Sequence, residues 1–232
     1  MENKSNYSVP IAIVLAGIII AGAMYFSDGQ KAITSEPIKK VSGLDQIRPV
    51  SEDDHIRGNP NAPLVIVEYS DTECPFCSRF HTTMKQVMTD YGKDGKVAWV
   101  YRHSPLDQLH SKSRQEATAL ECANELGGND KFWAYADRIY QITPANDGLD
   151  LAELPKIAEF IGLDVAKFNT CLVSNKYAEK IQADLDNAQA TGGQGTPWSI
   201  VIAKDGNRYP LNGAQPYAQV KQLIDSLLKP LN

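Results

Sequence analysis

Two cysteines three residues apart, Cys74 and Cys77, form the motif Cys-Pro-Phe-Cys. The motif follows a short apolar run, residues 64–69, and opens a stretch whose apolar residues recur with helical period. Exposed N–H groups and the helix dipole stabilise a thiolate at a helix N-terminus, so we expect a lowered pKa for Cys74. Cys77, one turn into the helix, is expected to be the buried partner. The pair predicts a redox-active disulfide in which Cys74 is the nucleophile and Cys77 resolves the mixed disulfide.

The same spacing also occurs in zinc sites, which need four ligands in a tetrahedral arrangement. Only Cys122, Cys171 and four scattered histidines could complete such a site, and none of them stands at ligand spacing. We therefore expect no metal. We also expect no organic cofactor, because the dithiol is itself the redox group.

The size and charge of the chain limit its function. Its 232 residues can hold one substantial domain, and 43% hydrophobic and 22% charged residues are ordinary for a globular protein. The formal net charge is −5 and no long basic run occurs, so the composition argues against nucleic-acid binding.

The N-terminus carries an apolar segment after a short tail, residues 1–8. Residues 9–26 contain no charged side chain and would span about 27 Å as a helix, enough for a bilayer core. We favour a transmembrane signal anchor, because the segment is longer than a usual cleaved signal sequence; cleavage after the sequence Ala21-Gly22-Ala23 is the alternative. Either interpretation places the rest of the chain outside the cytoplasm.

The remaining sequence predicts a linker, residues 27–58, followed by one α/β domain, residues 59–232. The linker shows no sustained period, apart from a short helical turn near residues 44–47. In the domain we expect a strand at 64–69, a helix from the cysteines to Gly92, and a strand at 97–102. This order is a βαβ unit with a parallel sheet. A helical insertion at about 106–191, a hairpin at 199–211 and a final helix from Pro216 complete the prediction.

This order of elements resembles the thioredoxin fold with a helical insertion, as found in DsbA-like thiol-disulfide oxidoreductases. The segment GNPNAPLVIVEYSDTECPFCSRFH is similar to the membrane-anchored or secreted branch of that family. The resemblance covers residues 57 to about 228. It implies a thioredoxin-like fold and an enzyme that exchanges disulfides.

The resemblance also implies roles for three residues near the motif. Pro197, after a glycine-rich loop, resembles the cis-proline of the fold, and Thr196 before it is then the position that contacts the substrate peptide. Glu68 matches an acid that moves a proton to or from the resolving thiol, and it alternates with Leu64 and Ile66, so it shares an apolar face. The residues alone leave two alternatives open: an ordinary trans peptide at Pro197 and a solvent-exposed Glu68.

Two aromatic residues beside these positions are candidates for substrate binding, Phe76 and Trp198. Phe76 stands where the strong oxidants of the family have a histidine that stabilises the thiolate. Since phenylalanine has no charge and donates no hydrogen bond, a weaker oxidant or an isomerase-like redox poise is compatible with the motif. We expect His103, at the end of a predicted strand, to be a structural histidine.

Cys122 and Cys171 both lie in the predicted helical insertion, and we expect a structural disulfide between two of its helices. Closing a loop of about 50 residues would stabilise the fold by roughly 4 kcal/mol in the chain-entropy model. The alternative is two buried free thiols.

The sequence thus predicts a membrane-anchored, extracytoplasmic thiol-disulfide oxidoreductase that acts on cysteine-containing secreted or envelope proteins. The family resemblance implies a quinone-linked membrane protein as its redox partner, and we expect a monomer. The alternatives are an isomerase or reductase of the same fold, a non-catalytic dithiol module that handles a metal such as copper, and a peptide-binding chaperone on the same scaffold.

Overall fold

The computed structural model describes residues 42–229. The predicted tail and membrane anchor, residues 1–26, lie outside the described residues. Within residues 42–229, no helix combines the length and the apolarity that a bilayer crossing needs.

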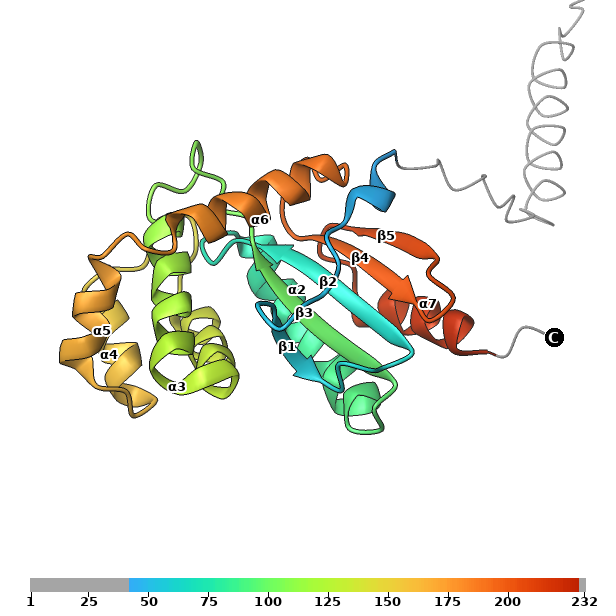
Figure 1. Cartoon of the computed structure of the whole chain (residues 1–232), viewed down its shortest axis with the longest axis horizontal. Helices are drawn as coiled ribbons and strands as arrows, with labels where there is room; N and C mark the ends of the chain where they lie inside the picture. Colours follow the sequence, from blue (N-terminus) through green and yellow to red (C-terminus); the bar gives the residue numbers. More distant parts are fainter. Residues whose placement is uncertain (1–41, 230–232) are drawn as a thin grey trace, which may run out of the picture. The chain divides into compact units, whose positions relative to one another are not determined.

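A five-stranded mixed sheet forms the centre of the domain (Figure 1). Its strands lie in the order β1-β3-β2-β4-β5, and only the central β2–β3 pair is parallel. The strands are β1 (His55–Gly58), β2 (Leu64–Ser70), β3 (Val97–His103), β4 (Trp198–Ala203) and β5 (Arg208–Asn212).

Helices cover both faces of this sheet, which explains the continuous apolar sequence of β2. On one face, α2 (Pro75–Val87) and α7 (Tyr217–Leu228) pack against the sheet and each other, whereas α6 (Ala178–Ala190) crosses the other face (Figure 1). Alternate residues of β2 therefore enter different clusters: Ile66 packs with α2 and α7, and Val67 packs under α6. Each such fully buried side chain contributes roughly 1.5–3 kcal/mol.

The helical insertion lies between β3 and β4. It consists of α3 (Ser113–Ile142), α4 (Glu153–Phe160) and α5 (Val165–Leu172), followed by α6. The helical path of α3 breaks at Gly128, whose φ of 72° is a left-handed conformation that glycine adopts easily. This glycine therefore kinks α3 into two helical parts. The thioredoxin-like fold with a helical insertion is confirmed.

Part of the predicted linker, residues 27–58, belongs to the sheet instead. Strand β1 falls within these residues and Ile47 is buried under α6, whereas the helical turn predicted near residues 44–47 is present as the 3₁₀ turn η1 (Leu44–Gln46). Strand β1 pairs antiparallel with β3 at the edge of the sheet. With only four residues and one glycine, it is too short to show an alternating pattern. The helical stretch predicted from the cysteines to Gly92 is present as α2 and a π-helical turn, η2 (Met88–Gly92), which follows Val87 directly.

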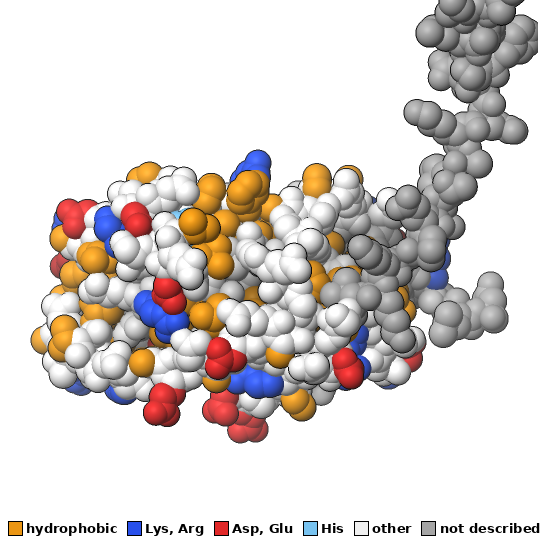
Figure 2. Space-filling view, turned by 90° about the horizontal axis from the view of Figure 1, so that it is seen from above, with side chains coloured by type: hydrophobic (Ala, Val, Ile, Leu, Met, Phe, Trp, Pro, Cys, Tyr) orange, Lys and Arg blue, Asp and Glu red, His pale blue; other side chains and the backbone are white. Residues whose placement is uncertain are grey.

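Acidic and basic side chains are interspersed on the face of the domain shown in Figure 2. The net charge of −5 is therefore not gathered there into one large acidic or basic surface.

Candidate active site

The two motif cysteines occupy the N-terminus of α2 in the reduced form. Cys74 is the N-cap residue, with extended backbone angles, and Pro75 is the first residue of the helix, where no N–H is needed. Cys74 is 3% exposed and Cys77 is fully buried. Both residues are therefore buried, and only Cys74 keeps a small exposed area.

The surroundings of the two thiols shift their pKa values in opposite directions. A hydrogen bond from Cys77 lowers the pKa of Cys74 to about 6 against the effect of burial, and contacts from Thr196 and from the N–H groups of Phe76 and Cys77 add to the lowering. Burial raises the pKa of Cys77 well above its ordinary value, and the neighbouring Cys74 raises it further. Near neutral pH the pair thus holds its negative charge on Cys74, where an attacking thiolate is needed.

The glycine-rich loop before β4 lies against Cys74. The Thr196–Pro197 peptide is cis, and the Cys74 thiol lies 3.5 Å from the Thr196 carbonyl oxygen, in donor geometry. The loop approaches α6 closely at Gly193, where a Cβ would stand 2.8 Å from the carbonyl oxygen of Ala188. The structure thus places Thr196 and Pro197, which the sequence predicted to lie at the active site, next to the nucleophile Cys74.

Glu68 lies beneath the cysteines on the face of β2 that packs against α2. It is fully buried, and one carboxylate oxygen accepts a hydrogen bond of 2.8 Å from the indole N–H of Trp99. Burial raises the pKa of Glu68 to about 7, and negative charge on Cys74 adds to the rise. The negative charge of Glu68 in turn raises the pKa of Cys77. A carboxyl that titrates near neutrality beside the resolving thiol is suited to proton transfer.

Asp71 connects the motif to the start of the insertion, and the sequence analysis missed it. Its backbone N–H lies 3.4 Å from the sulfur of Cys77, and its carbonyl oxygen accepts from the N–H of Cys74 at 3.1 Å. Its buried carboxylate lies 2.9 Å from Nδ1 of His110 and accepts from the Ser113 hydroxyl at 2.7 Å. These partners lie about 40 positions away, so no local motif identifies them.

A second acid beside the nucleophile was also missed. Glu73 immediately precedes Cys74 and is fully buried, as is Glu116 in the first turn of α3. Burial and the neighbouring Glu73 raise the pKa of Glu116 to about 9, so this carboxyl is protonated at neutral pH. A neutral Glu116 limits the negative charge behind the Cys74 thiolate.

The two aromatic candidates are in different environments. Phe76 is 52% exposed at the active-site surface, and the Arg79 guanidinium stacks on its ring at 4.7 Å. Trp198 is only 3% exposed, donates to the Thr191 hydroxyl at 3.0 Å, and belongs to the cluster under α6. The expectation that Trp198 lines a substrate groove is therefore corrected: its strand position turns it to the face of the sheet opposite Cys77.

Cys122 and Cys171 form a disulfide, the pairing expected from the sequence. It joins α3 to α5, with Cα atoms 5.8 Å apart and a sequence separation of 49 residues. This bond lies in the insertion, among residues that pack the helices together, so its position is that of a structural crosslink.

The sequence matches a known protein family. The family model described as thioredoxin covers residues 50–226, and the chain therefore belongs to the thioredoxin family. Among curated proteins, it is 36% identical over 206 residues to a protein named Na⁺/H⁺ antiporter NhaA 1 from Mycobacterium sp. strain KMS. The match covers 88% of this chain and 31% of that relative, so the chain spans about a third of the length of the curated relatives it matches.

The fold is similar to those of solved DsbA proteins. Pseudomonas aeruginosa DsbA2 is 29% identical with a TM-score of 0.65, and the similarity covers 79% of this chain and 99% of that one. Oxidised BdbD from Bacillus subtilis has a TM-score of 0.69 at 21% identity, over 79% and 97% of the two chains. Together with the Cys74–Cys77 pair, the family and the DsbA-like fold confirm the predicted enzyme class, a thiol-disulfide oxidoreductase.

Proposed function

We propose that this member of the thioredoxin family is a membrane-tethered, extracytoplasmic enzyme that introduces disulfide bonds into secreted or envelope proteins. The observation that carries the proposal is the unequal pair of thiols. Cys74, which is 3% exposed, has a pKa of about 6, and the fully buried Cys77 has a strongly raised pKa. Stabilising the Cys74 thiolate stabilises the reduced enzyme, which is the property that makes such a dithiol an oxidant.

The reaction begins from the oxidised enzyme, in which Cys74 and Cys77 share a disulfide. A substrate thiolate attacks the sulfur of Cys74, a mixed disulfide forms, and the electron pair of the broken bond leaves on Cys77. Glu68, with a pKa near 7, can deliver the proton that this buried thiolate takes up. A second substrate thiolate then attacks the substrate sulfur and releases Cys74. The substrate loses two electrons and the enzyme gains them as a dithiol.

The surface around Cys74 is suited to a peptide substrate. Phe76 offers an exposed ring beside the nucleophile, and the partly buried Thr196 offers backbone groups on the cis-proline loop. An extended segment that pairs with this backbone would hold its cysteine against Cys74 through main-chain hydrogen bonds, which do not depend on substrate sequence. We therefore propose a broad range of cysteine-containing protein substrates.

The location and redox partner are part of the same proposal. The apolar segment 9–26 supports a membrane anchor, and the Cys122–Cys171 disulfide supports an oxidising compartment. After each reaction the dithiol needs an electron acceptor, and we propose a quinone-linked membrane protein. The name Na⁺/H⁺ antiporter belongs to relatives of which this chain spans 31%, so it does not by itself assign ion transport to this chain.

The direction of exchange is tested by the reduction potential of the Cys74–Cys77 pair. The detergent-solubilised full chain is equilibrated with glutathione buffers, with Cys122 and Cys171 intact. A value near about −120 mV supports oxidation of substrates, whereas a value near about −270 mV would assign a reductant. An intermediate value of about −180 mV would favour an isomerase. Phe76 is the observation that favours this alternative, because it stands where strong oxidants have a histidine that stabilises the thiolate.

A turnover assay separates the proposal from the non-catalytic alternatives. Refolding of a reduced protein that needs disulfides is followed with the wild-type chain and with Cys74→Ser. We expect the variant to lose all activity. Retained activity would indicate a chaperone, and tight stoichiometric Cu(I) binding without thiol turnover would indicate a metal-handling module.

A further inference from the structure

Three buried side chains with metal-binding atoms lie together away from the cysteines. His55 begins β1, His103 ends β3, and Glu121 is on α3. Nε2 of His55 is 2.8 Å, and Nε2 of His103 is 2.9 Å, from the same carboxylate oxygen of Glu121. Each of the three residues is at most 2% exposed. Two imidazoles and a carboxylate therefore converge on one point.

The donor set and its spacing are those of a transition-metal site. Two histidines and one glutamate are a ligand set of zinc enzymes, and the same set binds other divalent transition metals. Ligand atoms about 2.0–2.2 Å from a shared tetrahedral ion stand roughly 3.3–3.6 Å apart. The potential ligand atoms of His55, His103 and Glu121 all lie within 4.8 Å of one another. Small side-chain rotations would thus bring them around one ion.

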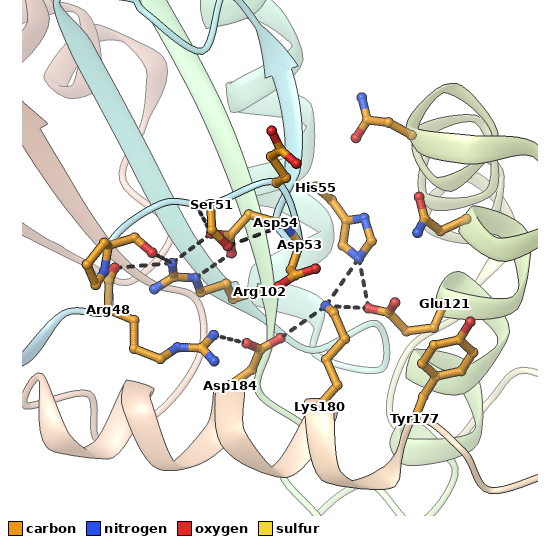
Figure 3. Close-up of a pocket in the computed structure, with 14 residues that line it drawn as sticks. Arg48, Ser51, Asp53, Asp54, His55, Arg102, Glu121, Tyr177, Lys180 and Asp184 are labelled. Carbon is orange, nitrogen blue, oxygen red and sulfur yellow. Dashed lines mark hydrogen bonds and ion pairs between the residues drawn. The ribbon is translucent and has the colours of Figure 1, made fainter.

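A cavity of about 840 Å³ gives the cluster access from solvent. His55 and Glu121 line this cavity, together with residues of α6 and of the segment before β1 (Figure 3). An ion could enter through it and keep a water molecule in the fourth coordination position, as in zinc sites with three protein ligands.

Lys180 now occupies the place of the cation. Its ammonium group reaches from α6 to within 2.8 Å of the same Glu121 oxygen and 3.4 Å of Nε2 of His55 (Figure 3). The side chain is 29% exposed, and its nitrogen is also 3.9 Å from a carboxylate oxygen of Asp184. A flexible lysine at the edge of a cavity can therefore turn towards Asp184 and solvent, and leave the three ligands to a metal ion.

We propose that His55, His103 and Glu121 form a binding site for a divalent transition-metal ion, with Zn²⁺ as the probe, and that the ion displaces the ammonium group of Lys180. The proposal departs from the expectation of no metal, and it does not depend on the proposed function. The site connects two strands to α3, so a bound ion would crosslink the sheet to the helical insertion. Because the ion binds the folded chain, it would raise the melting temperature.

The experiment titrates Zn²⁺ into the full-length chain with Cys74 and Cys77 oxidised to a disulfide, which prevents the dithiol from binding the metal. Calorimetry measures stoichiometry and affinity, and Co²⁺ absorption reports the ligand type. We expect one ion per chain, and a rise in melting temperature. Glu121→Gln and His103→Ala should weaken binding at least tenfold, whereas Lys180→Met should strengthen it at least tenfold.

His110→Asn is the matched control, because His110 is also buried and paired with one carboxylate, that of Asp71, and it should bind Zn²⁺ like wild type. Lys180→Met keeps all three ligands, so it tests the site even where His103→Ala fails to fold. If the wild-type chain does not bind Zn²⁺, the proposal is overturned. This holds even if Lys180→Met binds Zn²⁺, because the ammonium group of Lys180 would then not be displaced by the ion in the natural chain. Wild-type affinity in Glu121→Gln would overturn it as well.

Discussion

Nδ1 of His110 lies 2.9 Å from a carboxylate oxygen of Asp71, and both residues are buried beside the redox motif. Burial alone would lower the pKa of His110, but the hydrogen bond to Asp71 and the negative charge of Cys74 raise it above its ordinary value. Asp71 in turn accepts from the backbone N–H of Glu73, the residue before the nucleophile. A histidine from a distant loop therefore lies near Cys74 in surroundings that favour its protonated form, whereas the motif itself has the uncharged Phe76.

Substitution of His110 should make Cys74 less acidic. In His110→Asn we expect the pKa of Cys74 to rise above about 6, because the variant loses the attraction between the thiolate and the protonated imidazole, the same attraction that raises the pKa of His110 in the wild-type chain. The measurement is thiolate absorbance at 240 nm against pH. Asp107→Asn is the control, since Asp107 is in the same loop but exposed and paired with Arg114. An unchanged pKa in His110→Asn would show that the imidazole does not act on the thiolate.

The lowered pKa of Cys74 also predicts how the stability of the reduced enzyme depends on pH. The unfolded thiol titrates near 9 and the folded one near 6, so the folded state binds fewer protons between these values. The stabilisation from this group is therefore absent below about pH 6 and grows as the pH rises towards 9. At pH 7 it is on the order of 1 kcal/mol.

The measurement compares the free energy of unfolding of the dithiol and disulfide forms of the Cys74–Cys77 pair at pH 5 and pH 7, with Cys122–Cys171 kept oxidised. The dithiol form should gain stability relative to the disulfide form between these two values. Cys74→Ala forms no active-site disulfide, so its free energy of unfolding should change between pH 5 and pH 7 as that of the wild-type disulfide form does. A change in Cys74→Ala as large as that of the wild-type dithiol form would assign the pH effect to other groups.

The sequence predicted those parts of the protein that depend on nearby residues. The apolar run of β2 and the helical period after Cys77 are local patterns, and the burial of Glu68 follows from its alternation with Ile66. The same alternation, applied to Trp198 and Ile200, would have placed Trp198 on the face covered by α6. Its position next to Pro197 suggests the active site, but its place in strand β4 decides the direction of the side chain.

The remaining features depend on contacts between distant segments. His55 and Glu121 are 66 residues apart, and Asp71 and His110 are 39 apart, so their pairing requires the folded sheet to bring strand ends and helix starts together. Strand β1 was missed for the same reason: its four residues become a strand only by pairing with β3. Such contacts leave no periodic signal in the sequence.

Glu68 should control the proton transfer that accompanies the breaking and forming of the Cys74–Cys77 bond. Glu68→Gln keeps the acceptor for the Trp99 indole N–H but cannot take up or release a proton. We expect the lifetime of the mixed disulfide to increase about tenfold or more, because general acid–base catalysis typically contributes about 10²–10⁴-fold. The measurement is acid quenching and mass spectrometry of the mixed disulfide with a model peptide. Glu153→Gln, at a partly exposed acid on α4 that pairs with Lys156, should leave the lifetime unchanged.

The Cys122–Cys171 disulfide should stabilise the fold without setting the redox chemistry. In the double variant Cys122→Ser, Cys171→Ser, the unfolded chain regains the freedom of a loop of 49 residues, and the chain-entropy model gives a loss of about 4 kcal/mol. Chemical denaturation of wild type and variant, both with Cys74 and Cys77 oxidised, measures this loss. The reduction potential of the active-site pair should stay within about 30 mV of the wild-type value. A shift of about 30 mV corresponds to a coupling of about 1.4 kcal/mol between the two disulfides. A larger shift would mean that the insertion acts on the thiolate of Cys74, and the bond would then have a redox role besides its structural one.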